Sequence, residues 1–266
     1  MWFEAHTFGL NVAQAACVAL PASGLPGWLE RFRGRAWALV LPLSIALVVV
    51  AITLVPTSAT ALSWIAFVLV PPGCALALGW AAHGSRPWLA SISIPLLAVA
   101  WAFQDRPSGQ VAATLLIAGS AVTLGRLLAG VAPLSLLKAG VVLMAAVDAY
   151  LVFSGQLEAP NAVLVAANPP LGLPRLQSGA FGGSTLGYGD FFAAAVVGGV
   201  LAAQHSRQVV AALAMLVVTL CWNQLFTVYD VLPATIPPAV VLIASEVLRT
   251  RGRKAAISGP RRELFS

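Results

Sequence analysis

Long apolar stretches separated by short polar turns dominate this chain of 266 residues. A helix needs about 20 mostly apolar residues to cross a bilayer. Nine stretches approach or reach this length, the first and last being the shortest: 8–22, 36–55, 59–81, 87–104, 109–130, 134–154, 185–204, 208–227 and 233–248. The pattern predicts an all-α, polytopic membrane protein with about nine transmembrane helices.

The composition agrees with this pattern. Hydrophobic residues make up 59% of the chain and charged residues only 9%, whereas a soluble domain carries about 25% charged residues. This excludes an ordinary soluble protein, and we expect the lipid bilayer rather than a nucleic acid as a partner. We expect a single membrane domain over 1–266, with five helices in 1–133, four in 134–248 and a basic tail over 249–266.

The basic residues predict the orientation of the chain. In a nine-span arrangement, thirteen of the fifteen Lys and Arg residues fall on one side of the membrane, and only Arg106 and Arg175 fall on the other. Lysine and arginine in short loops favour the cytoplasmic side. We therefore predict an integral membrane protein with an external N-terminus and a cytoplasmic C-terminus.

Two carboxylates lie inside predicted spans. Asp148 is about one and a half helical turns from the end of the sixth span, and Asp190 is about as far into the seventh. A carboxylate at such a depth costs roughly 2.5–3.5 kcal/mol on insertion scales, so it is a functional candidate. Because one span leads out of the membrane and the next leads back in, both carboxylates are expected at a similar depth, nearer the external face.

Two neighbouring carboxylates are compatible with three interpretations. In the first they share one proton, so that one deprotonates a water while the other protonates a scissile carbonyl, as in aspartic proteases. A proton- or cation-coupled transporter uses membrane carboxylates equally well. In the third reading, the aspartates are unrelated and bond nearby backbone or hydroxyl groups. No metal site is expected, because the cysteines Cys17, Cys74 and Cys221 are widely separated.

Three short elements follow one another in the order of a known family. They are Val147-Asp148 in the sixth span, Gly187-Tyr188-Gly189-Asp190 in the seventh, and Leu232-Pro233-Ala234 before the ninth. They resemble the Tyr-Asp, Gly-x-Gly-Asp and Pro-Ala-Leu motifs of the presenilin and signal peptide peptidase family of intramembrane aspartyl proteases. The likeness covers roughly 140–248, and the short spacing of its motifs resembles the compact, prokaryotic members.

The resemblance implies a presenilin-like fold and an aspartic endopeptidase without metal or organic cofactor, in the plasma membrane of a prokaryote. Its substrates would be transmembrane helices that are locally unwound before cleavage, and helices six to nine would be the catalytic part. Asp148 and Asp190 would be the catalytic residues. Active-site support is implied for Gly187, Tyr188, Gly189 and Tyr150, with the two tyrosines as hydrogen-bond partners of the aspartates. Substrate positioning is implied for Leu232, Pro233 and Ala234.

The motifs depart from the family in two places. Val147 stands where the family has tyrosine, although Tyr150 follows two positions after Asp148. The third motif ends in threonine, as Pro233-Ala234-Thr235, and Pro238-Ala239-Val240 is a second possible match. A Gly/Pro-rich stretch from Asn168 to Ser184 is expected to form an irregular gate that admits water.

Other families share parts of the seventh-span motif. Thr185-Leu-Gly-Tyr-Gly-Asp190 differs by one residue from a potassium-channel filter, whose carbonyls line an extended pore segment. The preceding stretch is too rich in proline and glycine for a pore helix, and a channel leaves Asp148 without a role. Prepilin peptidases also carry Gly-x-Gly-Asp, usually followed by lysine, whereas Phe191 follows here.

Overall fold

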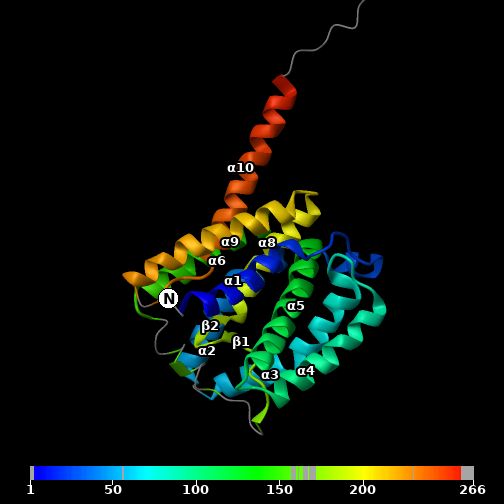
Figure 1. The fold of residues 1–266 in the computed structure, drawn as a ribbon. Coiled ribbons are helices and arrows are strands. Elements are labelled where there is room, and N and C mark those ends of the chain that lie inside the picture. Colours follow the sequence, from blue (N-terminus) through cyan, green and yellow to red (C-terminus); the bar gives the residue numbers. More distant parts are fainter. Residues whose placement is uncertain are drawn as a thin grey trace, which may run out of the picture.

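The computed structural model describes residues 3–258, except 56, 157–159, 161, 164–166, 168–171 and 230. The described part is mostly helical and contains one small hairpin of strands (Figure 1). The helices are α1 (Phe3–Ala19), α2 (Val40–Leu54), α3 (Ser58–Leu76), α4 (Ser93–Ala102), α5 (Pro107–Val131), α6 (Leu134–Phe153), α8 (Tyr188–Ala203), α9 (Gln208–Asn223) and α10 (Ile236–Ser258). Short 3-10 or π segments flank them: η1 (Gly27–Phe32), η2 (Arg35–Leu39), η3 (Ala77–Ala81), η4 (Pro87–Ile92) and η6 (Gln224–Thr227).

Each of the nine predicted spans contains a helix, but their lengths differ. Within the described residues, five helical segments are long and apolar enough to cross a membrane: Arg35–Leu54, Ser58–Ala81, Pro107–Val131, Leu134–Phe153 and Gln208–Thr227. Three apolar helices are shorter: Thr7–Ala19, Pro87–Ala102 and Tyr188–Ala203. The chain thus has the helices of a polytopic membrane protein, of which five have spanning length.

The all-α prediction is wrong between the sixth and seventh predicted spans. There β1 (Ser178–Phe181) pairs antiparallel with β2 (Ser184–Gly187), with Phe181 opposite Ser184. The two turn residues, Gly182 and Gly183, have φ values of 56° and 94°. A two-residue hairpin turn with both central residues at positive φ favours glycine, which explains the Gly-Gly pair. The seventh helix therefore begins at Tyr188 rather than at 185.

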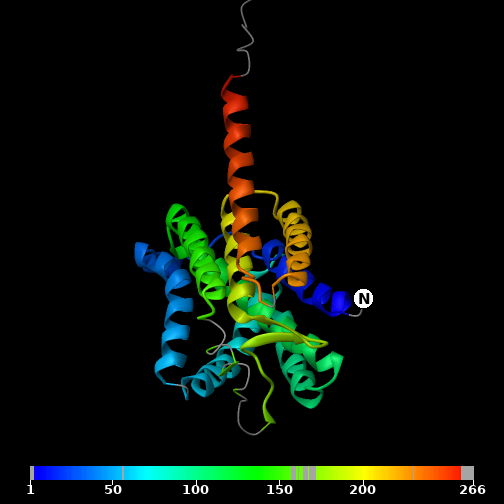
Figure 2. The same ribbon diagram turned by 90° about the vertical axis from the view of Figure 1, so that its left-hand side faces the viewer.

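Helix α8 is the centre of the packing, with every residue from Phe191 to Ala202 buried. It packs against α5 and α1, which come from the first half of the chain (Figure 2). Its Gly198 allows this close approach, because a Cβ there would lie 2.5 Å from the carbonyl oxygen of Val18 on α1. Small residues at helix interfaces are typical of membrane packing. An inner helix covered by protein does not need the full length of a lipid-facing span.

Several links that carry basic residues meet at one end of the molecule. The Arg126 guanidinium at the end of α5 donates to the carbonyls of Gly24 (3.0 Å) and Trp80. His83, after η3, pairs with Gln208 at the start of α9 at 3.0 Å. The free end of α10 projects from this same end, away from the hairpin (Figures 1 and 2).

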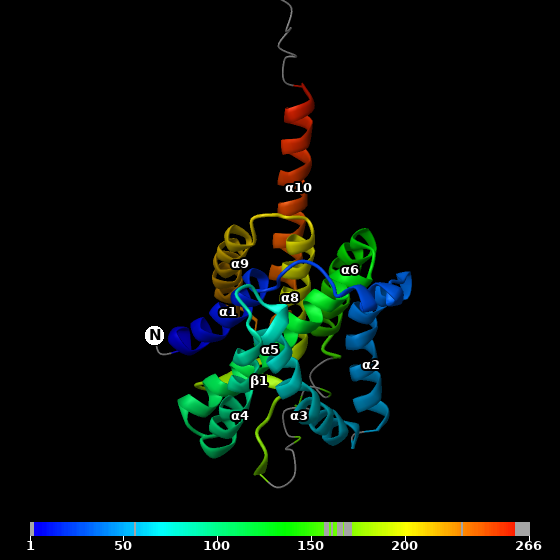
Figure 3. The same cartoon turned by 90° about the vertical axis from the view of Figure 1, so that its right-hand side faces the viewer.

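Helix α10 differs from the ninth predicted span at both ends. It begins at Ile236 rather than at 233 and continues through the predicted tail to Ser258. Residues 259–266, with the tail's Arg261 and Arg262, lie outside the described residues. Figure 3 shows α10 between α9 and α6, with α2 on the far side of α6.

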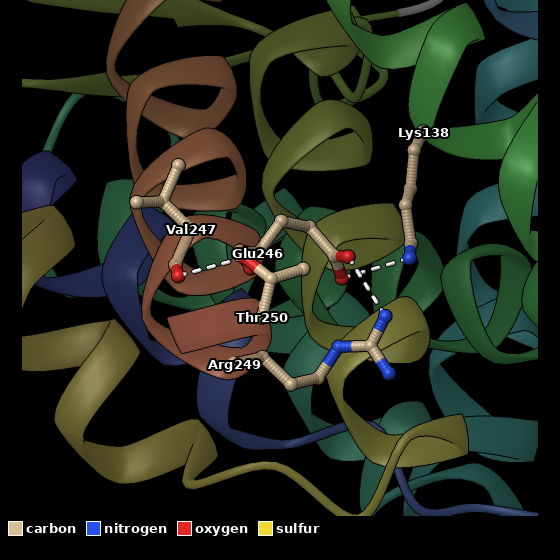
Figure 4. A network of polar contacts seen from close by, with 5 residues as sticks. All are labelled: Lys138, Glu246, Val247, Arg249 and Thr250. Atoms are coloured by element: carbon tan, nitrogen blue, oxygen red, sulfur yellow. Dashed lines mark hydrogen bonds and ion pairs between the residues drawn. The ribbon is translucent and has the colours of Figure 1, made fainter. Parts of the chain in front are cut away.

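An ionic network joins α10 to α6 (Figure 4). The Glu246 carboxylate accepts from Lys138 Nζ at 2.7 Å and from the Arg249 guanidinium at 2.9 Å. The Thr250 hydroxyl lies one turn further and donates to the Glu246 carbonyl. The Lys138 and Glu246 side chains are 20% and 23% exposed, so the pair is shielded more than a surface ion pair. The network fixes the projecting helix to the body of the protein.

Replacing Glu246 with alanine is expected to lower the free energy of unfolding by about 1–2 kcal/mol, because two half-buried cations lose their charge-assisted bonds. Thermal unfolding of the purified protein in detergent measures the change. Arg251 lies on the same helix and is exposed, so Arg251→Ala is the matched control and is expected to have no effect. Equal losses in both variants would contradict a stabilising network.

Candidate functional site

The two aspartates predicted to act together lie on adjacent helices. Asp148, on α6, is buried with 7% of its surface exposed. Asp190 lies half-buried in the first turn of α8, and α8 is in contact with α6. One turn before Asp148, the Met144 methyl group lies 3.8 Å from the position that a Cβ would take at Gly189. The two carboxylates therefore belong to one site between α6 and α8.

The Gly-x-Gly-Asp motif forms the junction between the hairpin and α8. The Gly187 amide donates to Asp190 Oδ2 at 3.1 Å, so the aspartate caps the start of its own helix. A Cβ at Gly187 would lie 3.2 Å from the same oxygen. A larger residue there would require the carboxylate to shift by a few tenths of an ångström. A carboxylate in the first turn also interacts favourably with the helix dipole.

The segment before α10 reaches Asp148 through Thr235. The Thr235 hydroxyl donates to Asp148 Oδ2 at 2.6 Å, and its backbone amide lies 3.4 Å from the same oxygen. Thr235 is 2% exposed, so the bond is shielded from solvent. Leu232, Pro233 and Ala234 lead directly into this contact as a non-helical segment. The bond fixes one oxygen of Asp148 and leaves its other oxygen available.

Two side chains from other helices hold this segment in place. The Gln14 side-chain amide on α1 donates to the backbone carbonyls of Asp190 (3.4 Å) and Ala234 (3.3 Å). Gln14 is 1% exposed. The Trp222 indole on α9 donates to the Pro233 carbonyl at 3.2 Å. Helices α1 and α9 thus bond the segment Leu232–Ala234 directly, and α6 bonds the next residue, Thr235.

The two tyrosines of the predicted site do not contact the aspartates as expected. The Tyr188 hydroxyl pairs with that of Ser120 on α5 at 2.9 Å. Tyr150 is 64% exposed, because it lies two positions after Asp148 and a helix turns about 200° over two residues. Within the described chain, the hydroxyl partner of an aspartate is Thr235, which the sequence analysis noted only as a departure from the family motif.

The second Pro-Ala pair is placed differently from the first. Pro238 and Ala239 lie within the first turns of α10, while Pro233 and Ala234 lie in the non-helical segment that leads to Asp148. The first pair is therefore the one that faces the site. Of the expected water gate, residues 168–171 lie outside the described residues.

The potassium-filter reading requires an extended backbone through the motif, so that successive carbonyls line a pore. Here only residues 184–187 are extended, and they pair with β1. Tyr188, Gly189 and Asp190 form the first turn of α8. A filter-like row of carbonyls is therefore not formed by this segment.

Comparisons with models of protein families, with curated proteins and with solved structures gave no match to this chain. Across the described residues, no three His, Cys, Asp or Glu side chains gather as a metal centre. The chemistry that the site offers is that of two carboxylates on adjacent helices, one of them held by a threonine hydroxyl.

Proposed function

We propose that this chain is an intramembrane aspartyl protease that hydrolyses peptide bonds within transmembrane segments through Asp148 and Asp190. One observation carries the proposal: Gln14 bonds the carbonyls of both Asp190 and Ala234, and the segment Leu232–Ala234 leads to Asp148 through Thr235. The three motif elements are far apart in the sequence, yet they meet at this site. If the two aspartates had separate structural roles, there would be no reason for the three motif elements to lie together.

The proposed reaction uses the two carboxylates with one proton between them. The ionised member takes a proton from a water molecule, whose oxygen attacks the scissile carbonyl carbon, while the protonated member donates its proton to the carbonyl oxygen. In the second step the first carboxyl protonates the amide nitrogen and the C–N bond breaks. The other carboxylate recovers a proton from the diol as the carbonyl re-forms. The dyad returns to its starting state, with an acid and an amine as products.

Thr235 is proposed as a positioning residue for Asp148. Replacing it with valine keeps the shape but removes the hydroxyl that lies 2.6 Å from Asp148 Oδ2. A hydrogen bond to a charged group contributes about 1.5–3 kcal/mol, so we expect kcat to fall by roughly 10- to 100-fold. KM is expected to stay nearly unchanged, because Thr235 acts through Asp148.

Thr235→Ser restores the hydroxyl and is the matched control, with most of the activity expected to return. The assay is the rate at which a model single-span substrate is cleaved in liposomes. If Thr235→Val and Thr235→Ser were equally slow, the effect would come from packing and the positioning role would be refuted.

The membrane arrangement belongs to the same proposal. With nine crossings, the end that carries the β hairpin is external, and the basic end with the α10 tail is cytoplasmic. The links with basic residues that meet at one end support this orientation. Single cysteines introduced at Arg251 and at Gly183 test it with a membrane-impermeant thiol reagent applied to intact cells. Labelling at Gly183 and not at Arg251 is expected, and the reverse pattern would overturn the orientation.

The test of the function is reconstitution of the full chain in liposomes with a labelled single-span substrate, followed by mass spectrometry of the fragments. Cleavage inside the span, lost in both Asp148→Asn and Asp190→Asn, is the expected result. The alternative is a transporter or channel, and ion flux in the same liposomes measures it. Flux without any cleavage would replace the protease proposal with transport through the same carboxylates.

A further inference from the structure

A cavity of about 670 Å³ opens at the basic end of the molecule, away from the aspartates. Its walls come from the link between α1 and α2, the end of α5, the start of α6 and the turn after α8. Representative lining residues are Leu25, Arg33, Arg35, Gly130, Leu134 and His205. The cavity is large enough for a small polar group together with part of an apolar chain.

The charge of this cavity is of one sign. Among the described residues that line it, the charged ones are Arg33 and Arg35, and none is acidic. Arg33 donates through Nε to the Gly130 carbonyl at 3.2 Å and through one terminal nitrogen to Glu30 at 3.4 Å, which leaves its other terminal nitrogen available. Arg35 has no hydrogen bond or ion pair with the residues that the structure describes. Two arginines whose side chains keep donors unused by the described residues thus line one cavity.

The residues around the cavity are of the kind expected at the level of lipid head groups. Trp28, Phe32 and Trp37 lie on the same link as the two arginines, and they are 59%, 52% and 43% exposed. Exposed aromatic residues, tryptophan above all, collect at membrane–water interfaces. Leu25 and Leu134 add an apolar part to the wall. The cavity therefore combines cationic donors with apolar surface, which suits an amphiphilic anion.

We propose that this cavity binds the phosphate group of an anionic ligand, with Arg33 and Arg35 as the donors. Guanidinium groups bind phosphate through paired hydrogen bonds, and basic pockets between helices bind anionic lipid head groups. In a bilayer the nearest source of such a phosphate is an anionic phospholipid. A soluble phosphate ester carries the same group, so the test separates the two sources. The site does not depend on the protease proposal.

The experiment uses the purified full chain in neutral detergent with four probes: phosphatidylglycerol, phosphatidylcholine, glycerol 3-phosphate and inorganic phosphate. Native mass spectrometry measures bound lipid, and thermal unfolding measures stabilisation. We expect one retained phosphatidylglycerol with at least 10-fold weaker binding of the other three probes. The double variant R33A/R35A is expected to lose at least 10-fold in affinity for phosphatidylglycerol.

Arg31 provides the matched control. It lies on the same link and is exposed, but it donates to the Trp28 carbonyl and does not line the cavity. Arg31→Ala is expected to keep the wild-type affinity. Equal losses in R31A and R33A/R35A, or equal binding of phosphatidylcholine, would overturn the site. Glycerol 3-phosphate binding as tightly as phosphatidylglycerol would support the phosphate site and overturn a lipid as its source.

Discussion

Asp148→Asn is expected to lower the cleavage rate of a transmembrane substrate by about 10³-fold or more, since general acid–base catalysis contributes roughly 10²–10⁴-fold. The amide keeps the shape of the carboxylate but cannot take a proton from water. The Thr235 hydroxyl, which donates to Asp148 Oδ2, can donate to the amide oxygen in the same way. We therefore expect the variant to fold, and thermal unfolding beside the cleavage assay separates lost chemistry from lost structure.

Asp105→Asn is the control for this substitution. Asp105 is exposed in the turn between α4 and α5, so its variant removes a carboxylate without touching the dyad. Wild-type cleavage is expected from Asp105→Asn. If Asp148→Asn cleaved as fast as this control, Asp148 would have no catalytic role and the pair would be reduced to Asp190 alone.

Among the variants proposed for this protein, Gly198→Ala is expected to produce the largest loss of stability. The new methyl group would lie 2.5 Å from the carbonyl oxygen of Val18 and 2.7 Å from that of Cys17. Both contacts are with backbone, so α1 must move away from α8, and overpacking of this kind costs about 1–3 kcal/mol and occasionally more. The displaced α1 also carries Gln14, which bonds the Asp190 and Ala234 carbonyls. Cleavage is therefore expected to fall together with the thermal midpoint.

Gly252→Ala is the matched control. Gly252 lies in α10, and a Cβ there meets nothing within 4 Å. Alanine is the better helix former by about 0.8–1 kcal/mol, so this variant is expected to be as stable as the wild type or slightly more so. Unfolding midpoints in detergent measure both variants. A Gly198→Ala protein as stable as Gly252→Ala would show that α1 and α8 are not in close contact.

Hydrophobic length predicted the positions of the helices well, because a long apolar run has few other stable arrangements in a bilayer. The same property was a poorer predictor of which helices are long enough to cross a membrane. Tyr188–Ala203 has only 16 residues, and as a buried inner helix it is covered by protein rather than by lipid. Hydropathy cannot distinguish protein from lipid as the apolar surroundings. The continuation of α10 to Ser258 was also missed. The basic residues in this stretch argue against a membrane span, but they do not argue against a helix.

The aspartates were found from the sequence because a carboxylate inside an apolar run is costly and therefore conspicuous. Their partners were harder to find. Thr235 is a small polar residue beside a proline-rich segment, and its role depends on a contact 87 positions away in the chain. Gln14 was visible as a polar residue in the first span, but the carbonyls it would bond were not. The Gly182-Gly183 pair is a local signal for a hairpin turn. The strand after it, β2, was not predicted, because the apolar residues that follow β2 made it look like the start of the seventh span.

The most direct test of the dyad is an experimental structure of the full chain with a hydroxyl-containing transition-state analogue of peptide hydrolysis. We expect the hydroxyl to lie between the two aspartates, about 2.6–3.2 Å from a carboxylate oxygen of both Asp148 and Asp190. Carboxylates about 10 Å or more apart, with the analogue bound elsewhere, would contradict it.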